Sequence, residues 1–235
     1  MKILLGLILC LIFQGIFLES SFAFVDSNVR EFLENRVNQW PELYLPNFKL
    51  SDTSEDLIYP KWFEGNWLVT SQDIINDSEE PVIYKVNFFK NDSDLIVGNR
   101  AKNSESIGKA IFGDTLIKVV NDPKSINNQI TYLKDDFYID SRIKGRNQIQ
   151  DDEIFFADEL VIQTAHKPNA SRINQVEIIS KFQKCSEEIL EVKNSIKPSI
   201  CGFQYVASYG SKVGDPSIHA VKTNKYKLKF EFIES

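Results

Sequence analysis

From Asp56 onward, apolar and polar residues alternate with a period of two in many short segments. The last segment is the clearest, because Tyr226, Leu228 and Phe230 alternate with lysines. Such alternation predicts strands that bury one face. We expect about ten strands, at residues 67–71, 82–89, 95–100, 116–120, 129–133, 137–143, 154–164, 176–182, 203–209 and 226–233. Because short turns join most of them, the pattern favours one antiparallel sheet that closes into a barrel or folds into a sandwich.

Helical spacing precedes these strands. Apolar residues recur at helical intervals between capping residues at 26–28 and a proline at 41, namely Val29, Phe32, Leu33, Val37 and Trp40. This spacing predicts an amphipathic helix whose apolar stripe packs on the domain or closes one end of it.

Three further segments interrupt or precede the strands. Residues 41–55 are polar and punctuated by proline, so we expect them to be irregular. A short helix is expected at 104–111, with Ile107, Ala110 and Ile111 inward, and a helical excursion is expected at 185–197.

The first 23 residues have the order of a secretory signal peptide. Lys2 precedes an apolar run at residues 3–18, and Ser21 and Ala23 supply small residues before a cleavage point. The alternative is a retained membrane anchor, but the run is shorter than a usual span and Glu19 follows it. We therefore divide the chain into a signal peptide (1–23), an N-terminal helix with an irregular segment (24–55) and a β domain (56–235).

Composition narrows the class of protein. Hydrophobic residues make up 43% and charged residues 26%, which is typical of a globular domain. The net charge of −6, without a basic block, argues against a nucleic-acid surface. After removal of the leader, Cys185 and Cys201 are the remaining cysteines. In an exported protein they can pair and stabilise the fold by about 3 kcal/mol, and the alternative is two buried thiols.

The sequence supports no catalytic, metal or cofactor site. His166 and His219 have no second metal-ligating residue at short spacing. Neither a nucleophile elbow nor a glycine-rich phosphate loop occurs, so enzyme activity is not supported. The best basic candidates for holding an anionic head group in an otherwise apolar pocket are Arg100, Lys102, Lys109, Arg142, Lys144 and Arg146, and Arg100 is the first of them. The alternative is that these residues are surface charges at sheet edges.

The segment at residues 56–71 carries the most specific motif. Gly65 followed by Trp67 at the start of a strand resembles the Gly-x-Trp signature of lipocalin-like (calycin) barrels, in which the Trp plugs the closed end. The resemblance implies a single antiparallel β-barrel of about 8–10 strands, with a basic residue on the Trp face. Lys225, Lys227 and Lys229 are the candidates for that residue.

Several blocks resemble an uncharacterised domain family shared by cyanobacteria and plant chloroplasts. They are residues 57–67, which include Trp62, residues 99–110, which include Arg100, residues 174–177 and the closing strand at 226–228. The similarity runs from about Trp40 to the C-terminus. It implies an exported protein of a photosynthetic cell, in the thylakoid lumen or the periplasm, and implies no activity.

Together these observations predict a mostly-β, single-domain binding module for a small apolar or amphipathic molecule, such as a lipid or pigment. The expected ligand-binding residues are Trp62, Trp67, Arg100 and Arg142. One alternative is an accessory factor that docks on a membrane complex through Phe32, Leu33 and Trp40. A second alternative is an enzyme that modifies a chromophore or lipid.

Overall fold

The computed structural model describes residues 27–48, 55–76, 80–186, 197–210 and 218–234. The predicted signal peptide lies outside these residues. The central part of the helix expected at 185–197 also lies outside them. The mostly-β class is confirmed, and so is the N-terminal helix, which is described over residues 27–39.

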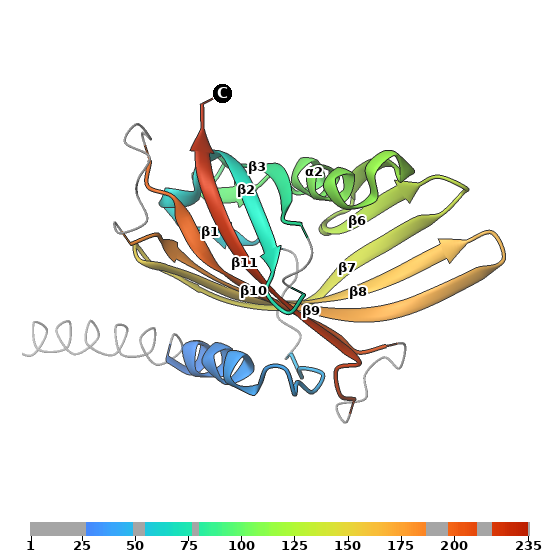
Figure 1. The fold of residues 1–235 in the computed structure, drawn as a ribbon, viewed down its shortest axis with the longest axis horizontal. Helices are drawn as coiled ribbons and strands as arrows, with labels where there is room; N and C mark the ends of the chain where they lie inside the picture. Colours follow the sequence, from blue (N-terminus) through green and yellow to red (C-terminus); the bar gives the residue numbers. More distant parts are fainter. Residues whose placement is uncertain (1–26, 49–54, 77–79, 187–196, 211–217, 235) are drawn as a thin grey trace, which may run out of the picture.

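Within the described residues, eleven strands form one antiparallel sheet (Figure 1). Its spatial order is β1-β4-β3-β2-β11-β10-β9-β8-β7-β6-β5, so most strands pair with their neighbours along the chain. The strands are β1 (Ile58–Tyr59), β2 (Gly65–Asp73), β3 (Val82–Lys90), β4 (Ile96–Gly98), β5 (Leu116–Asp122), β6 (Ser125–Leu133), β7 (Tyr138–Gln150), β8 (Ile154–Lys167), β9 (Ala170–Lys184), β10 (Ile200–Ser208) and β11 (Lys222–Ile233). Short 3-10 turns, η1 (Lys61–Phe63) and η2 (Gly113–Thr115), adjoin β2 and β5.

The sheet curls into a half-barrel rather than the closed barrel expected from the resemblance. Its edge strands are β1 and β5, and the described residues contain no ladder that joins them. Helix α2 (Arg100–Phe112) lies across the open side, next to β3 and β5 (Figure 1). The β3 backbone donates to this helix, from Lys85 N to Ser106 Oγ at 3.1 Å and from Asn87 N to Asn103 Oδ1 at 2.8 Å. Side chains of α2 therefore accept hydrogen bonds from backbone N–H groups of β3 that lie beyond the end of the short strand β4.

Helix α2 is longer than the helix expected at 104–111, and its inward face differs from the prediction. Ile107 lines the interior, but Ala110 is exposed and Ile111 is 59% exposed. The expectation for Ala110 and Ile111 was wrong because the helix starts four residues earlier, at the end of β4, and its first two turns make the contacts with the sheet.

Gly65 and Trp67 occupy the start of β2 in a tightly packed corner. Trp67 is fully buried, and its indole Nε1 donates to the carbonyl oxygen of Phe63 at 2.6 Å. Gly65 has a φ of 123°, and a Cβ at this position would lie 2.6 Å from the ring of Phe232. That ring packs edge-on against Trp67 at a centroid distance of 5.4 Å. Both the backbone conformation and the close approach require glycine here.

The basic residue expected over Trp67 is not found among the described residues. The aromatic ring of Phe232 takes that place. Lys225 lies instead over the ring of Tyr205, at 4.8 Å on the other side of the sheet. The expectation failed because alternation along β11 places Lys225 on the face opposite to Leu228 and Phe230.

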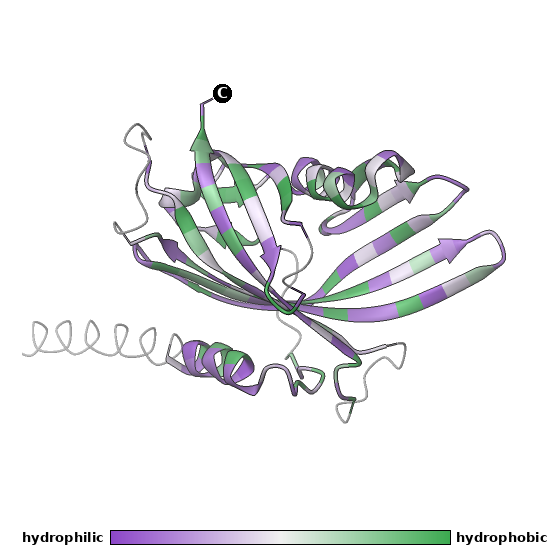
Figure 2. Cartoon of the chain, in the orientation of Figure 1, coloured by the Kyte–Doolittle hydropathy of each residue, from purple (hydrophilic) through white to green (hydrophobic). Residues whose placement is uncertain are grey.

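Hydrophobic clusters cover both faces of the sheet, as the alternating colours along the strands in Figure 2 indicate. The concave cluster includes Phe63, Trp67 and Phe155. The convex cluster lies beneath the N-terminal helix, on which Leu33 is fully buried. Phe32 and Trp40 pack against the same cluster. This confirms that the apolar stripe of the helix packs on the domain.

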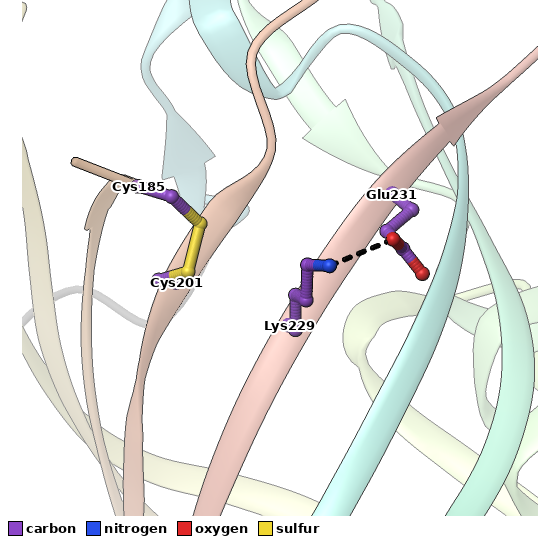
Figure 3. The surroundings of a disulfide bond; sticks show 4 residues. All are labelled: Cys185, Cys201, Lys229 and Glu231. Carbon is purple, nitrogen blue, oxygen red and sulfur yellow. Dashed lines mark hydrogen bonds and ion pairs between the residues drawn. A yellow bond between two sulfur atoms is a disulfide. The ribbon is translucent and has the colours of Figure 1, made fainter. Parts of the chain in front are cut away.

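A disulfide joins Cys185, directly after β9, to Cys201 in β10 (Figure 3). Their Cα atoms are 5.1 Å apart. On the adjacent strand β11, Lys229 forms an ion pair with Glu231 at 2.8 Å (Figure 3). The bridge closes the base of the connection between β9 and β10 covalently.

Candidate functional site

A cavity of about 280 Å³ opens on the concave face of the half-barrel, beneath α2. Strands from both halves of the sheet line it, together with the first turns of the helix. Seven aromatic rings form its walls and floor: Tyr59, Phe63, Tyr84, Phe88, Phe155, Phe182 and Phe230. Tyr59 stacks on Phe155 at 4.7 Å, and Phe63 meets Phe88 edge-on at 4.9 Å. These contacts hold the rings in fixed positions, which favours a pre-formed apolar surface.

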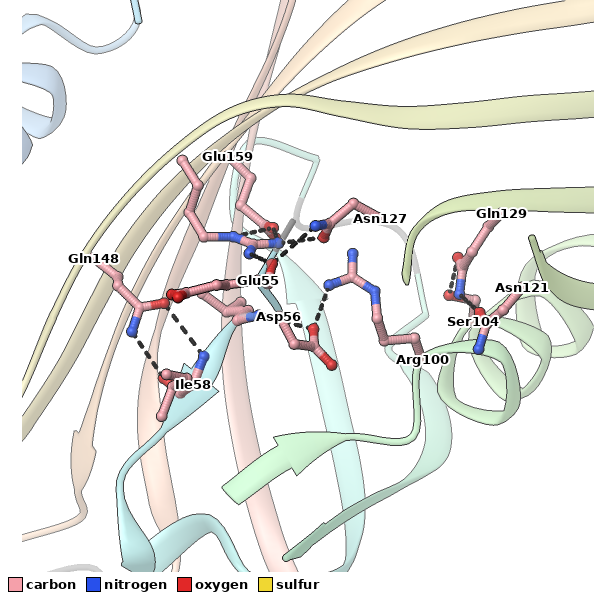
Figure 4. Close-up of polar contacts among 12 residues, drawn as sticks. Glu55, Asp56, Ile58, Arg100, Ser104, Asn121, Asn127, Gln129, Gln148 and Glu159 are labelled. Carbon is pink, nitrogen blue, oxygen red and sulfur yellow. Dashed lines mark hydrogen bonds and ion pairs between the residues drawn. The ribbon is translucent and has the colours of Figure 1, made fainter. Parts of the chain in front are cut away.

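Charged side chains converge at one end of this cavity. Arg100, the first residue of α2, donates from Nη1 to Asp56 Oδ1 at 2.8 Å (Figure 4). Arg146 of β7 donates to Glu159 Oε1 of β8, from Nε at 2.9 Å and from Nη2 at 2.6 Å. The four side chains are between 9% and 18% exposed. Two arginines and two carboxylates thus form two largely buried ion pairs at one polar end.

Arg146 also holds the backbone of the residues that precede β1 through hydrogen bonds. Its Nη1 donates to the carbonyl oxygen of Glu55 at 2.9 Å, and its Nη2 donates to Asn127 Oδ1 at 2.9 Å. Asn127 Nδ2 donates to the same Glu55 carbonyl at 2.8 Å. Because Asp56 follows Glu55 directly, this network positions the carboxylate that binds Arg100.

Burial and nearby charges shift the pKa values of three side chains that line the cavity, those of Arg100, Tyr59 and Tyr84. Burial opposes the charged form of Arg100, but the charges of Glu159 and Asp56 outweigh it and raise the pKa of Arg100. Burial, followed by the charge of Glu159, raises the pKa of the Tyr59 hydroxyl. Burial raises the pKa of Tyr84 to about 12, against a hydrogen bond with Ser71. Both tyrosines therefore keep their protons at neutral pH.

Of the residues predicted from the sequence to bind ligand, Arg100 lines this cavity, and the other three lie elsewhere. Trp62 stacks on Phe63 at 4.6 Å and donates from Nε1 to the carbonyl oxygen of Asp151 at 3.2 Å. Trp67 is a fully buried part of the core. Arg142 is exposed on β7. The motif at Gly65 and Trp67 thus contributes packing below the cavity, not a lining surface.

The sequence did not single out Asp56 and Glu159 as site residues, and it indicated Arg146 only as one of six basic candidates. A signal for Glu159 was present, because it is an ionisable residue within the largely apolar strand β8. A charge that faces the interior of a sheet needs a partner of opposite charge. Arg146 could not be assigned as that partner, since the register between β7 and β8 is irregular between Ile143 and Gly145.

A second buried polar cluster lies on the convex face. Arg36 of the N-terminal helix donates to both carboxylate oxygens of Glu177, from Nε at 2.7 Å and from Nη2 at 2.6 Å. Tyr209 donates its hydroxyl proton to Glu177 as well. Burial, followed by the charge of Glu177, raises the pKa of Asp158 well above its usual value. The hydrogen bonds between Arg36 and Glu177 attach the N-terminal helix to the sheet.

An outer groove of about 640 Å³ lies between α2 and β3, and its lining includes Lys85, Lys102 and Lys109. Lys109 forms an ion pair with Glu105 at 2.5 Å, and it is 60% exposed. The groove is larger than the concave cavity, but its lining combines solvated lysines with few apolar residues. Because aromatic rings and buried charges converge in the concave cavity, it is a better candidate for a ligand-binding site than the outer groove.

Within the described part of the chain, no group of three or more His, Cys, Asp or Glu residues could hold a metal ion. The helices in the described ranges are all too short or too polar to cross a membrane.

Residues 52–233 match a family described as a Domain of unknown function (DUF6816). Curated proteins and solved structures gave no match to the chain. The matched range contains every residue that lines the concave cavity and leaves out the N-terminal helix.

Proposed function

The chain belongs to the DUF6816 family of domains of unknown function, and from its cavity we propose that it is a binding module for a small apolar or amphipathic molecule. A lipid or a pigment is the class of ligand that such a cavity suits. The observation that carries the proposal is the cavity of about 280 Å³, with aromatic walls and a polar end. Small-molecule sites typically combine an apolar lining with a few convergent polar groups.

Binding without chemical change is the activity that these polar groups support. Arg100 and Arg146 are held in ion pairs, and the pKa values of Tyr59 and Tyr84 are raised. A general base requires a pKa near the working pH, and neither tyrosine is shifted in that direction. The proposed function is therefore retention or transport.

We place this function in an exported protein, in the thylakoid lumen or the periplasm. The predicted signal peptide at 1–23 supports this compartment. The disulfide between Cys185 and Cys201 supports it too, because such bridges persist in oxidising compartments.

An accessory factor that docks through the N-terminal helix receives less support. Leu33 is fully buried against the convex face, and Phe32 and Trp40 pack on the same cluster. These three side chains therefore pack the helix on the sheet.

The proposal is tested with a cavity-filling variant. Ile178 of β9 lines the cavity, whereas Ile173 of the same strand is 38% exposed away from it. We expect N-phenyl-1-naphthylamine, an uncharged fluorescent probe, to bind the wild type and the Ile173→Trp control with equal affinity. Ile178→Trp should weaken binding at least tenfold, because its indole occupies the cavity. Equal binding by all three proteins, each with unchanged circular dichroism, would overturn the proposed site.

A further inference from the structure

The charges at the polar end of the cavity cancel, and this restricts the ligand that the cavity can hold. Arg100 faces Asp56 at 2.8 Å, and Arg146 faces Glu159 at 2.6 Å. Asp56 and Glu159 supply two negative charges, and the two arginines supply two positive charges. A charged head group added here would leave one net charge in a largely desolvated space, which is unfavourable. An uncharged head group leaves the balance intact.

Hydrogen-bonding capacity nevertheless remains at this end. A guanidinium carries five N–H donors. Among the described residues, Asp56 is the hydrogen-bond partner of Arg100, through one nitrogen, although the Arg100 side chain is only 18% exposed. Both hydrogen bonds that Arg146 donates to Glu159 end on Oε1. The polar end can therefore donate to a ligand from Arg100 and accept from the second oxygen of Glu159.

The aromatic rings define the rest of the ligand. Tyr59 and Phe155 stack with an angle of 19° between their planes, and Phe155 and Phe182 are nearly parallel, at 8°. The ring of Tyr59 lies close enough to the ion pairs for the charges of Glu159 and Arg100 to act on its hydroxyl. Flat apolar surfaces thus lead directly to the polar end, and a planar molecule can contact both.

We propose that the cavity selects an uncharged, planar molecule that carries one hydroxyl or carbonyl oxygen, and that the ion pairs Arg100–Asp56 and Arg146–Glu159 exclude carboxylates, phosphates and amines. This replaces the expectation that Arg100 holds an anionic head group, because Asp56 already neutralises it. The inference rests on the proposed function and specifies the chemical class of its ligand.

Three probes with the same ring test the selectivity: 2-naphthalenemethanol, 2-naphthoate and 2-naphthylmethylammonium, titrated calorimetrically into the purified protein at pH 7. We expect the alcohol to bind the wild type at least tenfold more tightly than either ion. This ranking needs no variant, so the test stands even if a variant fails to fold.

Two variants then shift the charge balance. Asp56→Asn leaves Arg100 unpaired, and the preference should change by at least tenfold toward 2-naphthoate. Arg100→Gln leaves Asp56 unpaired, and the preference should change toward the ammonium probe. Asp94→Asn removes the same charge as Asp56→Asn from an exposed turn, where Asp94 pairs with Lys90, and it should leave the ranking unchanged.

Each outcome decides between the two proposals. Tight binding of 2-naphthoate to the wild type, equal to that of the alcohol, would overturn this inference and leave the binding function standing. A ranking that does not change in Asp56→Asn would also overturn it. If none of the three probes binds the wild type, the proposed function fails, and the inference fails with it.

Discussion

Arg142 and Arg146 are four residues apart on β7, yet they lie on opposite faces of the sheet. Arg142 is opposite Ile162 and Arg146 is opposite Glu159, so a step of four residues on β7 matches a step of three on β8. The additional residue is a β-bulge between Ile143 and Gly145. Because successive side chains alternate between faces, the bulge turns Arg146 towards Glu159, which lines the cavity, and leaves Arg142 on the opposite face.

This relationship predicts different effects for the same substitution. Arg146→Gln leaves the carboxylate of Glu159 without its partner, and it should lower the free energy of unfolding by about 3 kcal/mol. Arg142→Gln should change it by less than about 0.5 kcal/mol, because Arg142 is exposed. Urea denaturation of both variants measures the difference. Similar losses for the two variants would contradict the assignment of Arg146 to the interior.

The ion pair between Arg36 and Glu177 should be the main polar attachment of the N-terminal helix. Their side chains are 8% and 0% exposed. Arg36→Met should cost about 3–5 kcal/mol, because it leaves a buried carboxylate unpaired. Arg36→Met combined with Glu177→Gln should cost less than the sum of the two single variants.

Arg30 of the same helix provides the matched control. It pairs with Asp151 at 3.6 Å, and its side chain is 49% exposed. Arg30→Met should therefore change the free energy of unfolding by at most about 1 kcal/mol. Equal costs for Arg30→Met and Arg36→Met would show that the buried pair does not attach the helix.

Stability should depend on pH through Asp158. Burial and the nearby charge of Glu177 raise the pKa of its carboxyl in the folded protein. In the unfolded chain an aspartate ionises at a pH of about 4. The contribution of this carboxyl to stability is therefore fully present below that pH and is lost as the pH rises towards the raised pKa of the folded state.

Asp158→Asn removes the stability loss that accompanies ionisation of this carboxyl as the pH rises. We expect the variant to raise the midpoint of thermal unfolding at pH 7 and to have a smaller effect at pH 4. Asp136→Asn, in the exposed turn before β7, is the control and should change neither value. If Asp158→Asn lowered stability relative to wild type, and did so more at pH 7 than at pH 4, Asp158 would be ionised in the folded protein.

Gly65 and Gly113 should differ in their tolerance of alanine. At Gly65, with φ at 123°, an added Cβ would lie 2.6 Å from the Phe232 ring. Gly65→Ala should therefore cost about 2–4 kcal/mol through backbone strain and overpacking. At Gly113, with φ at 54° and ψ at −134°, no atom lies within 4 Å of the added Cβ, so Gly113→Ala carries backbone strain alone and should cost less than Gly65→Ala, about 1–3 kcal/mol. Thermal unfolding of the two variants provides the comparison, and the reverse order would contradict it.

The sequence predicted the strands well where alternation was regular. The segments expected at 82–89 and 226–233 lie within β3 and β11. It missed β1, which has two residues, Ile58 and Tyr59, because no periodicity can be seen over that length. It also ended β7 at residue 143, because the bulge beside Gly145 interrupts the alternation there.

The candidate site was predicted through Arg100, and Arg146 was indicated only as one of six basic candidates. Its other charged members depend on register and on tertiary contacts, and neither can be read from one sequence. Asp56 and Arg100 are brought together because α2 crosses the open side of the half-barrel. Glu159 meets Arg146 because of one additional residue in β7. The N-terminal helix was predicted correctly because a contiguous stripe at helical spacing needs no knowledge of its partner.

If the concave cavity holds a small molecule, the protein should carry that molecule when it is purified under mild conditions from its own host. Native mass spectrometry, together with an absorbance spectrum, detects it. We expect one molecule per chain that dissociates as an uncharged compound, with any absorbance band leaving the protein at the same time. A chain mass without added ligand, either alone or in a stable complex with another protein, would contradict it.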